Sequence, residues 1–216
     1  MIIADGIKKS YQELHVLKGI HLEIKTGEIV AIVGASGAGK STLLHILGTL
    51  DRADSGSITF GGEEITKLNQ RRLATFRNRN IGFVFQQHHL LPEFSALENI
   101  CMPALIAGTS KSDAEQKSKH LLQLMNLDNR SDHRPSELSG GEQQRVAVAR
   151  ALVNNPKVVF ADEPSGNLDS ASAQSLHHLF FELRKQLNQT FVIVTHNIQL
   201  ADMADRKLTM KDGGII

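Results

Sequence analysis

The chain has 216 residues, and its 24 Lys and Arg against 23 Asp and Glu give a formal net charge of +1. This length suits one domain with a well-buried core, and the balanced charge gives no electrostatic reason to expect a nucleic-acid partner. The single cysteine, Cys101, excludes an internal disulfide and suits a reducing cytosol. We expect no signal peptide and no membrane span, because no apolar run approaches ~20 residues.

Short β-strands are predicted in the first part of the chain. Residues 20–25 alternate apolar and polar side chains, the period of a half-buried strand. Residues 28–33 form a short apolar run that is typical of a fully buried strand in a parallel sheet. Residues 57–60 and 81–86 are also apolar and β-prone, and they predict two more strands.

A mainly helical stretch is predicted from about residue 90 to residue 151. Ser112 and Glu115 match the capping box S-x-x-E ahead of the apolar positions at 121–125, so a helix is expected to begin there. Residues 129–139 lead from this helix to the next glycine-containing turn.

Strands and helices alternate again toward the C-terminus. After Pro156, residues 158–161 predict a buried strand, residues 176–187 an amphipathic helix, and residues 191–194 another strand. The pattern predicts a single α/β domain over 1–216, with a mainly parallel core sheet and an antiparallel N-terminal part. A helical subdomain at about 90–151 is expected to be inserted into this core.

A phosphate-binding loop is the first motif that carries chemistry. It lies between a predicted strand and a predicted helix, which is the context that the pattern G-x-x-x-x-G-K-[ST] requires. Its glycines allow backbone N–H groups to turn toward phosphate oxygens, and the helix N-terminus favours an anion. Lys40 is expected to reach the β- and γ-phosphates of ATP, and Ser41 to bind Mg²⁺. The candidate ATP-binding residues here are Gly34, Ala35, Ser36, Gly37, Ala38, Gly39, Lys40, Ser41 and Thr42.

Two carboxylates follow the buried strand at 158–161. Asp162 ends this strand, so it is expected at the carboxyl edge of the sheet, where ligands of such sheets bind. A carboxylate there suits Mg²⁺, and the adjacent Glu163 is the natural general base for the attacking water. Without the phosphate loop, the same residues would be interpreted as an acidic strand end that caps a turn.

A second glycine-containing turn has the sequence LSGGEQQR, from Leu138 to Arg145. With the phosphate loop, this turn identifies the chain as resembling the ATP-binding cassette (ABC) ATPases over nearly its whole length. In that family the turn contacts the γ-phosphate of ATP bound to the other subunit. The resemblance therefore implies the ABC ATPase fold, ATP hydrolysis and a dimer of two copies with ATP between them. It assigns to this second contact Ser139, Gly140, Gly141 and Glu142.

Other positions match this family one by one. Gln86 ends a predicted strand where the family has a glutamine that touches Mg²⁺ and the attacking water, although the neighbouring Gln87 leaves the register open. His196 ends another strand and resembles the histidine that contacts the γ-phosphate. The resemblance thus implies catalytic roles for Lys40, Gln86, Glu163 and His196, and metal contacts for Ser41, Gln86 and Asp162.

Further matches lie outside the catalytic residues. Residues 166–169, Gly-Asn-Leu-Asp, stand where the family has the loop that crosses the dimer seam. Tyr11 precedes the phosphate loop where the family stacks an aromatic side chain on adenine; the alternative is a surface tyrosine at a turn. Asn197 stands where the family often has Asp, and we expect this departure to affect the site only indirectly.

Within the ABC family, the chain most resembles the LolD branch, on the segment His-His-Leu-Leu-Pro at 88–92 and on residues 129–139 and 165–169. That branch drives lipoprotein release with integral membrane subunits of the LolC and LolE type, at the cytoplasmic face of the bacterial inner membrane. The FtsE and MacB branches are the alternatives, since they share Gly-Asn-Leu-Asp. ABC ATPases of DNA repair or translation fit less well, because the chain lacks long insertions and a second cassette.

A docking groove for the membrane subunits is the last expectation. Leu90, Leu91 and Phe94 follow Gln86 in the region where ABC transporters receive a short helix of the membrane partner. The alternative is that these side chains belong to the core of the helical subdomain.

Overall fold

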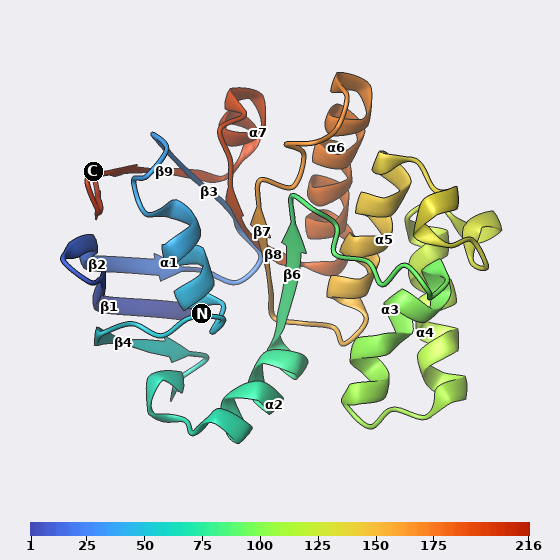
Figure 1. The fold of residues 1–216 in the computed structure, drawn as a ribbon, viewed down its shortest axis with the longest axis horizontal. Coiled ribbons are helices and arrows are strands. Elements are labelled where there is room, and N and C mark those ends of the chain that lie inside the picture. Colours follow the sequence, from blue (N-terminus) through green and yellow to red (C-terminus); the bar gives the residue numbers. More distant parts are fainter.

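A six-stranded sheet forms the centre of the computed structural model, which describes all 216 residues (Figure 1). Its strand order is β10-β9-β3-β8-β7-β6, with β10 antiparallel to β9 and the other neighbours parallel. Because β7 and β8 are covered on both faces, they are almost continuously apolar. The strands of this sheet are β3 (Ile29–Gly34), β6 (Ile81–Phe85), β7 (Val158–Asp162), β8 (Thr190–Val194), β9 (Arg206–Lys211) and β10 (Gly214–Ile215).

A second, antiparallel sheet has the order β2-β1-β4-β5. Its strands are β1 (Ile2–Tyr11), β2 (Leu14–Ile24), β4 (Ser55–Phe60) and β5 (Glu63–Glu64). The sequence pattern did not predict β1, because a register shift between Ala4 and Ile7 interrupts its period of two. One of the inward positions after this shift is moreover a lysine, Lys9.

Seven α-helices complete the fold: α1 (Lys40–Leu47), α2 (Gln70–Asn80), α3 (Ala96–Ile106), α4 (Lys111–Leu124), α5 (Gly140–Leu152), α6 (Ser170–Leu187) and α7 (Ile198–Met203). Short 3₁₀ turns lie at Ile65–Lys67, Asp128–Arg130 and Pro135–Glu137. Figure 1 shows α3, α4 and α5 grouped beside the central sheet, on the side away from the antiparallel sheet. None of these helices is both long and apolar enough to cross a membrane.

The start of α4 corrects one expectation. The predicted capping box at Ser112 and Glu115 is wrong, because α4 begins at Lys111 with Ser110 as its N-cap. The Ser110 hydroxyl accepts a hydrogen bond from the backbone N–H of Asp113 at 3.2 Å. The pattern S-x-x-D two residues earlier therefore sets the helix start, since either serine is a suitable cap and only one can precede the first turn.

The central sheet separates two hydrophobic cores. Val84, Val159 and Ala161 face the core that α3, α4, α5 and α6 cover. Val158 and Phe160 face the core shared with α1 and the antiparallel sheet. The α/β fold class and the antiparallel N-terminal part agree with the sequence prediction, and the alternation along β7 explains how one strand serves both cores.

Candidate functional site

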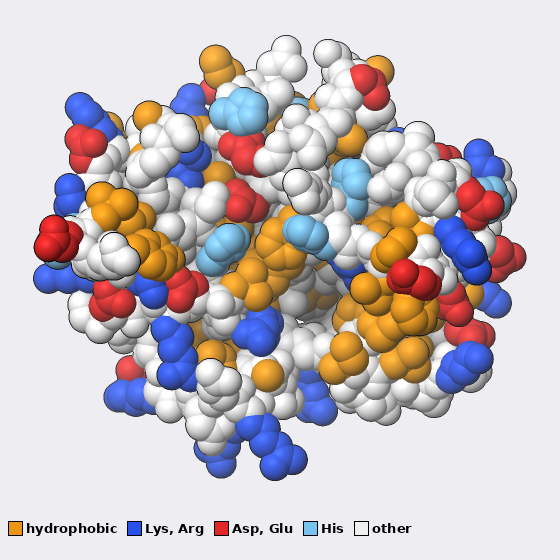
Figure 2. Space-filling view, in the orientation of Figure 1, with side chains coloured by type: hydrophobic (Ala, Val, Ile, Leu, Met, Phe, Trp, Pro, Cys, Tyr) orange, Lys and Arg blue, Asp and Glu red, His pale blue; other side chains and the backbone are white.

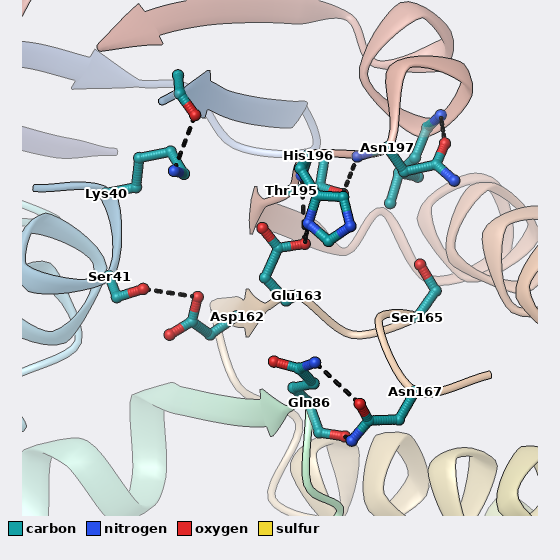
Figure 3. A network of polar contacts seen from close by, with 12 residues as sticks. Lys40, Ser41, Gln86, Asp162, Glu163, Ser165, Asn167, Thr195, His196 and Asn197 are labelled. Carbon is teal, nitrogen blue, oxygen red and sulfur yellow. Dashed lines mark hydrogen bonds and ion pairs between the residues drawn. The ribbon is translucent and has the colours of Figure 1, made fainter. Parts of the chain in front are cut away.

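The carboxyl ends of β6, β7 and β8 bring the predicted catalytic residues together. In the parallel register, Phe85 lies opposite Asp162, and Asp162 lies opposite Val194. The residues that follow these positions therefore emerge at one edge of the sheet. Figure 3 shows Gln86, Asp162, Glu163 and His196 around one opening, with Lys40 and Ser41 of α1 on its border.

The phosphate loop connects β3 to α1 through an open turn. Ala35 to Gly37 are exposed, whereas Ala38 and Gly39 are buried. Gly39 is the N-cap of α1 with φ 96°, and no side chain caps the amides of the first turn. A Cβ at Gly39 would lie 2.9 Å from Leu17 Cδ2, so both conformation and space require glycine here. The uncapped amides fit a bound phosphate group.

Lys40 lies back across this loop. Its ammonium donates hydrogen bonds of 2.9 Å to the carbonyl oxygens of Gly34 and Ala35. These carbonyls hold the cation at the mouth of the loop, where phosphate oxygens can replace them without a change in the helix. Thr42, two residues further, lies half-buried in the first turn of α1.

Ser41 and Asp162 form the candidate metal site. The Ser41 hydroxyl donates a 3.0 Å hydrogen bond to Asp162 Oδ1. Burial raises the pKa of the Asp162 carboxyl, an effect that the Ser41 hydrogen bond and the nearby His45 oppose. A hydroxyl and a carboxylate oxygen at this distance are the hard donors that Mg²⁺ prefers, so the residues fit this ion.

His45 is a site neighbour that the sequence analysis missed. Its Nε2 lies 3.6 Å from Asp162 Oδ2 and has no hydrogen-bond partner, although the atom is buried. The ring also lies edge-on to Phe85, with the ring centroids 6.4 Å apart. The signal was available, because His45 follows Ser41 by four residues and must lie one helical turn beyond it.

Glu163 and His196 form a direct pair. His196 Nδ1 lies 2.9 Å from Glu163 Oε2, and the backbone N–H of His196 donates to the same oxygen at 3.2 Å. Glu163 has φ 46°, a left-handed conformation that is costly for this residue type. The bond from its N–H to the carbonyl of Val194, at 2.9 Å, holds this conformation. The carboxylate is thus fixed by β8 on one side and the histidine on the other.

Gln86 contacts the loop after β7. Its Nε2 donates to Asn167 Oδ1 at 2.9 Å, and Asn167 Nδ2 donates to the Gln86 carbonyl at 3.3 Å. Figure 3 shows the amide oxygen of Gln86 on the side that faces Asp162. The adjacent Gly166 lets this amide approach closely, because a Cβ there would lie 2.8 Å from Gln86 Nε2 and the glutamine side chain would have to shift. Gln86 thus lies beside the loop that follows Asp162 and Glu163.

The turn LSGGEQQR opens α5, and a capping box within the chain serves two of its amides. Ser139 is the N-cap, and its hydroxyl accepts from the Glu142 N–H at 3.2 Å, while Glu142 accepts from the Ser139 N–H at 2.8 Å. Arg130, which the sequence analysis did not single out, donates to Glu142 at 2.9 Å. The Ser139 backbone hydrogen bond, followed by the Arg130 hydrogen bond, lowers the pKa of Glu142 to about 2.

This turn does not join the other candidate residues within one chain. Figure 1 shows α5 and α1 on opposite sides of the strands β6, β7 and β8. Ser139 and Gly140 are exposed, so they are accessible to a second molecule. A Cβ at Gly141 would lie 3.2 Å from Ser172 Oγ in α6. The absence of a side chain at Gly141 therefore lets this helix start lie close to α6.

Three further candidate residues lie at the end of β1 and at the starts of α6 and α7. Tyr11 ends β1, is 49% exposed and donates a 2.6 Å hydrogen bond to Asp51. Asp169 is the N-cap of α6 and accepts from the Ser172 N–H at 3.0 Å. Asn197 is the N-cap of α7 and accepts from the Leu200 N–H at 2.9 Å, so it orients the helix that follows His196.

The expected docking residues divide between core and surface. Leu90 packs against the hydrophobic core, whereas Leu91 and Phe94 are exposed. Phe94 lines a groove of about 580 Å³ along α3, together with Leu97, Met102 and Leu105. Acidic side chains, among them Glu98 and Glu115, border this groove. Figure 2 shows hydrophobic and acidic side chains side by side on this part of the surface.

The comparisons with known proteins indicate the same family as the sequence motifs. The family model described as ABC transporter matches residues 17–166. The lipoprotein-releasing system ATP-binding protein LolD of Cytophaga hutchinsonii is 59% identical over 213 residues, which cover 99% of this chain and 97% of that protein. The LolD protein of Bacteroides thetaiotaomicron is 57% identical over 215 residues, covering 100% of this chain and 99% of that protein.

Solved structures agree with the fold. The dimeric ATP-binding cassette MJ0796, in a post-hydrolysis state bound to ADP and Pi, has a TM-score of 0.91 and 37% identity. The match covers 100% of this chain and 96% of that one. The phosphate loop, the carboxylates after β7 and the turn before α5 thus occur in a fold and a sequence that match throughout, and this chain belongs to the ABC transporter family as an ATP-binding subunit most like the LolD proteins.

Proposed function

We propose that two copies of this chain hydrolyse ATP at their interface and thereby drive membrane subunits that release lipoproteins. One observation supports a site that is shared between two copies of the chain. The phosphate loop and the turn before α5 are both complete, yet they lie on opposite sides of β6, β7 and β8. A second copy in head-to-tail orientation supplies the missing turn, and its two-fold symmetry produces two equivalent sites.

Each half of the proposed site has its own task. The uncapped amides of α1 and the Lys40 ammonium bind the phosphates, and Ser139 with the amides of Gly140 and Gly141 contacts the γ-phosphate from the partner. Glu163 accepts a proton from the attacking water, since its carboxylate is held in place by His196. Gln86 orients this water through its amide oxygen.

Mg²⁺ is the metal that the donor set fits. Ser41 and Asp162 would hold it, with Gln86 as an additional oxygen ligand. When bound, the ion neutralises charge on the β- and γ-phosphates. The chain's own contribution is to present a half-buried carboxylate whose ionised form is costly without a cation.

The membrane partner and the cargo follow from the relatives. Relatives 59% and 57% identical over the full chain are named as ATP-binding proteins of the lipoprotein-releasing system. We therefore assign subunits of the LolC and LolE type as partners, at the cytoplasmic face of the bacterial inner membrane. The groove along α3 is the proposed docking surface, with Phe94 and Leu105 as apolar contacts.

Co-purification from detergent-solubilised membranes tests this assignment. The full-length chain should retain membrane proteins of the LolC and LolE type, and Phe94→Glu should lose them while ATP binding remains. Since Ile198 is also exposed but lies on α7, Ile198→Glu is the matched control. Recovery of an FtsX-type protein instead would contradict the lipoprotein assignment and support the cell-division branch.

A further inference from the structure

The hydroxyl of Tyr11 is tied to the helix that carries the phosphate loop. Its 2.6 Å hydrogen bond ends on the carboxylate of Asp51, just beyond the end of α1. The backbone N–H of Asp51 donates to the carbonyl of His45 at 3.2 Å, which anchors this carboxylate to the last turns of α1. The same helix begins with Lys40, so one short element positions both the tyrosine and the phosphate-binding lysine.

A buried lysine completes this cluster. Lys9 Nζ lies 3.0 Å from Asp51 Oδ1 and donates at 2.7 Å to the carbonyl of Arg52. The same ammonium lies 5.1 Å from the centre of the Tyr11 ring, at the distance of a cation–π contact. Because Lys9 is only 9% exposed, its partners are fixed by the fold.

The protonation equilibrium of the phenol agrees with this geometry. The hydrogen bond to Asp51, followed by burial, raises the pKa of the Tyr11 hydroxyl, while Lys9 and a hydrogen bond with Thr42 act in the opposite direction. Thr42 belongs to the first turn of α1, so the phenol lies near the start of this helix as well as beside Asp51. Tyr11 is nevertheless 49% exposed, which leaves ring surface available to a ligand.

We propose that Asp51 is a positioning residue for the nucleotide, because its hydrogen bond holds the Tyr11 ring in the orientation that stacks on adenine. The proposal rests on ATP binding in the proposed function and on the contact between Tyr11 and adenine that the family resemblance implies. A ring that is ordered before binding spares ATP the cost of ordering it, whereas a ring released from Asp51 can leave this orientation. Asp51 touches neither the phosphates nor the base.

The first arm of the test examines the free protein. Tyr11 is the only tyrosine and there is no tryptophan, so the tyrosine absorption band, which lies at longer wavelength than that of phenylalanine, reports on this side chain alone. Asp51→Asn should shift the tyrosine absorption and emission, because the phenol loses a charged acceptor. Asp54→Asn is the matched control: Asp54 lies in the same loop and bonds the Ser10 N–H at 2.6 Å, not the phenol. An unchanged spectrum in Asp51→Asn would overturn the proposal.

The second arm separates the base from the phosphates. Asp51→Asn should raise the Kd for ATP roughly three- to tenfold and leave the Kd for inorganic tripolyphosphate unchanged. In a Tyr11→Phe background, which keeps the ring but lacks the hydroxyl, Asp51→Asn should cause no further loss. Equal weakening for both ligands would show that Asp51 only supports α1, and would overturn the proposal.

A third variant distinguishes this proposal from the function on which it rests. Tyr11→Ala should weaken ATP binding roughly tenfold or more, as loss of a base–aromatic stack does. Wild-type ATP affinity in Tyr11→Ala would contradict the adenine contact itself and the role of Asp51 with it. A normal loss in Tyr11→Ala combined with no loss in Asp51→Asn would contradict only the role of Asp51.

Discussion

Two helix N-termini of this chain, which the proposed function assigns to the same phosphate chain, differ in how they are capped. At α1 the N-cap is Gly39, no side chain caps the first turn, and that turn contains no acidic residue. At α5 the N-cap is Ser139 in a complete capping box, with Glu142 in the first turn. No side chain caps the first turn of α1, whereas the box at α5 serves the amides of Ser139 and Glu142, though not those of Gly140 and Gly141.

The difference indicates an order of events. The amides of α1 gain hydrogen bonds when a phosphate binds, so this end can bind ATP within a single chain. The α5 end favours an anion less, because Glu142 adds a negative charge there, although the amides of Gly140 and Gly141 stay available to a phosphate. In the proposed dimer we therefore expect ATP to bind first at α1 and to contact the α5 turn of the partner copy afterwards.

The largest effect should come from the side of the site that carries the chemistry. Glu163→Gln keeps the shape of the side chain but removes the base, so turnover should fall about 10²- to 10⁴-fold while ATP affinity is retained. Phosphate release and nucleotide binding measure the two separately. Undiminished turnover in this variant would exclude Glu163 as the base.

The two glycines at the helix starts should respond unequally. Gly39→Ala forces a residue with φ 96° and a Cβ within 3.0 Å of the Val16 carbonyl, so it should cost about 1–3 kcal/mol of stability and abolish ATP binding. Gly140→Ala places its Cβ 3.7 Å from Leu168 Cδ2, an ordinary contact, and should change stability by less than about 1 kcal/mol.

Denaturant titration and ATP titration of both variants check this prediction. A Gly140→Ala variant as unstable as Gly39→Ala would mean that both helix starts are equally strained. The contrast between α1 and α5 would then be wrong.

Lowering the pH should weaken the capped helix start at α5, because its cap includes the ionised carboxylate of Glu142. The pKa of Glu142 is lowered from 4.5 to about 2 in the folded chain, so its contribution to stability is complete above pH 4.5. Glu142→Gln should lower the free energy of unfolding at pH 7 by about 1–2 kcal/mol, as loss of a capped, ion-paired helix start does. The difference from the wild type should shrink as the pH falls from 4.5 through 2.

The measurement is the free energy of unfolding of both proteins across this pH range. Arg130→Gln removes only one partner of Glu142 and should produce a smaller loss with the same pH dependence. A difference that stays constant down to pH 2 would contradict the assigned ionisation.

Of the two carboxylates considered for folding stability, the metal carboxylate should have the smaller effect. Burial raises the pKa of Asp162 above 3.8, so its ionised form costs folding free energy at neutral pH. Asp162→Asn should therefore stabilise the nucleotide-free protein by about 1 kcal/mol at pH 7, while Mg²⁺-dependent hydrolysis is lost. The gain should disappear below pH 3.8, where both folded and unfolded chains carry the protonated acid.

Thermal unfolding of the two proteins without nucleotide or Mg²⁺ checks this sign. Ser41→Ala is a useful comparison, because it removes the 3.0 Å hydrogen bond to Asp162 and should destabilise instead. A destabilised Asp162→Asn variant would show that the carboxylate supports the fold.

The sequence was sufficient for the parts of the molecule that depend on local pattern. The phosphate loop lies between β3 and α1, and the apolar runs of β7 and β8 are buried strands as predicted. The sequence did not predict strands and helices whose apolar pattern is interrupted or whose residues are mostly polar. The register shift in β1 hides its alternation, and α2 has four arginines and no buried residue, so no apolar stripe marks it.

Contacts between segments that are distant in the chain could not be predicted from the sequence either. The parallel register of β6, β7 and β8 places Gln86, Glu163 and His196 together, but their hydrogen bonds depend on side-chain orientation. Glu163 pairs with His196 because of a left-handed backbone conformation that no residue type indicates. The bonds of Arg130 to Glu142 and of Asp51 to Tyr11 join residues without a motif between them.

The molar mass of Glu163→Gln in solution, measured by light scattering with and without saturating ATP and Mg²⁺, tests the shared site most directly. A monomer of this chain has a mass of 23.7 kDa. We predict a monomer without nucleotide, a dimer of twice this mass with ATP, and a monomer again when Ser139→Ala and Gly141→Asp are added at the α5 turn. A protein that stays at 23.7 kDa while ATP is bound, or that dimerises equally well without an intact α5 turn, would contradict the account.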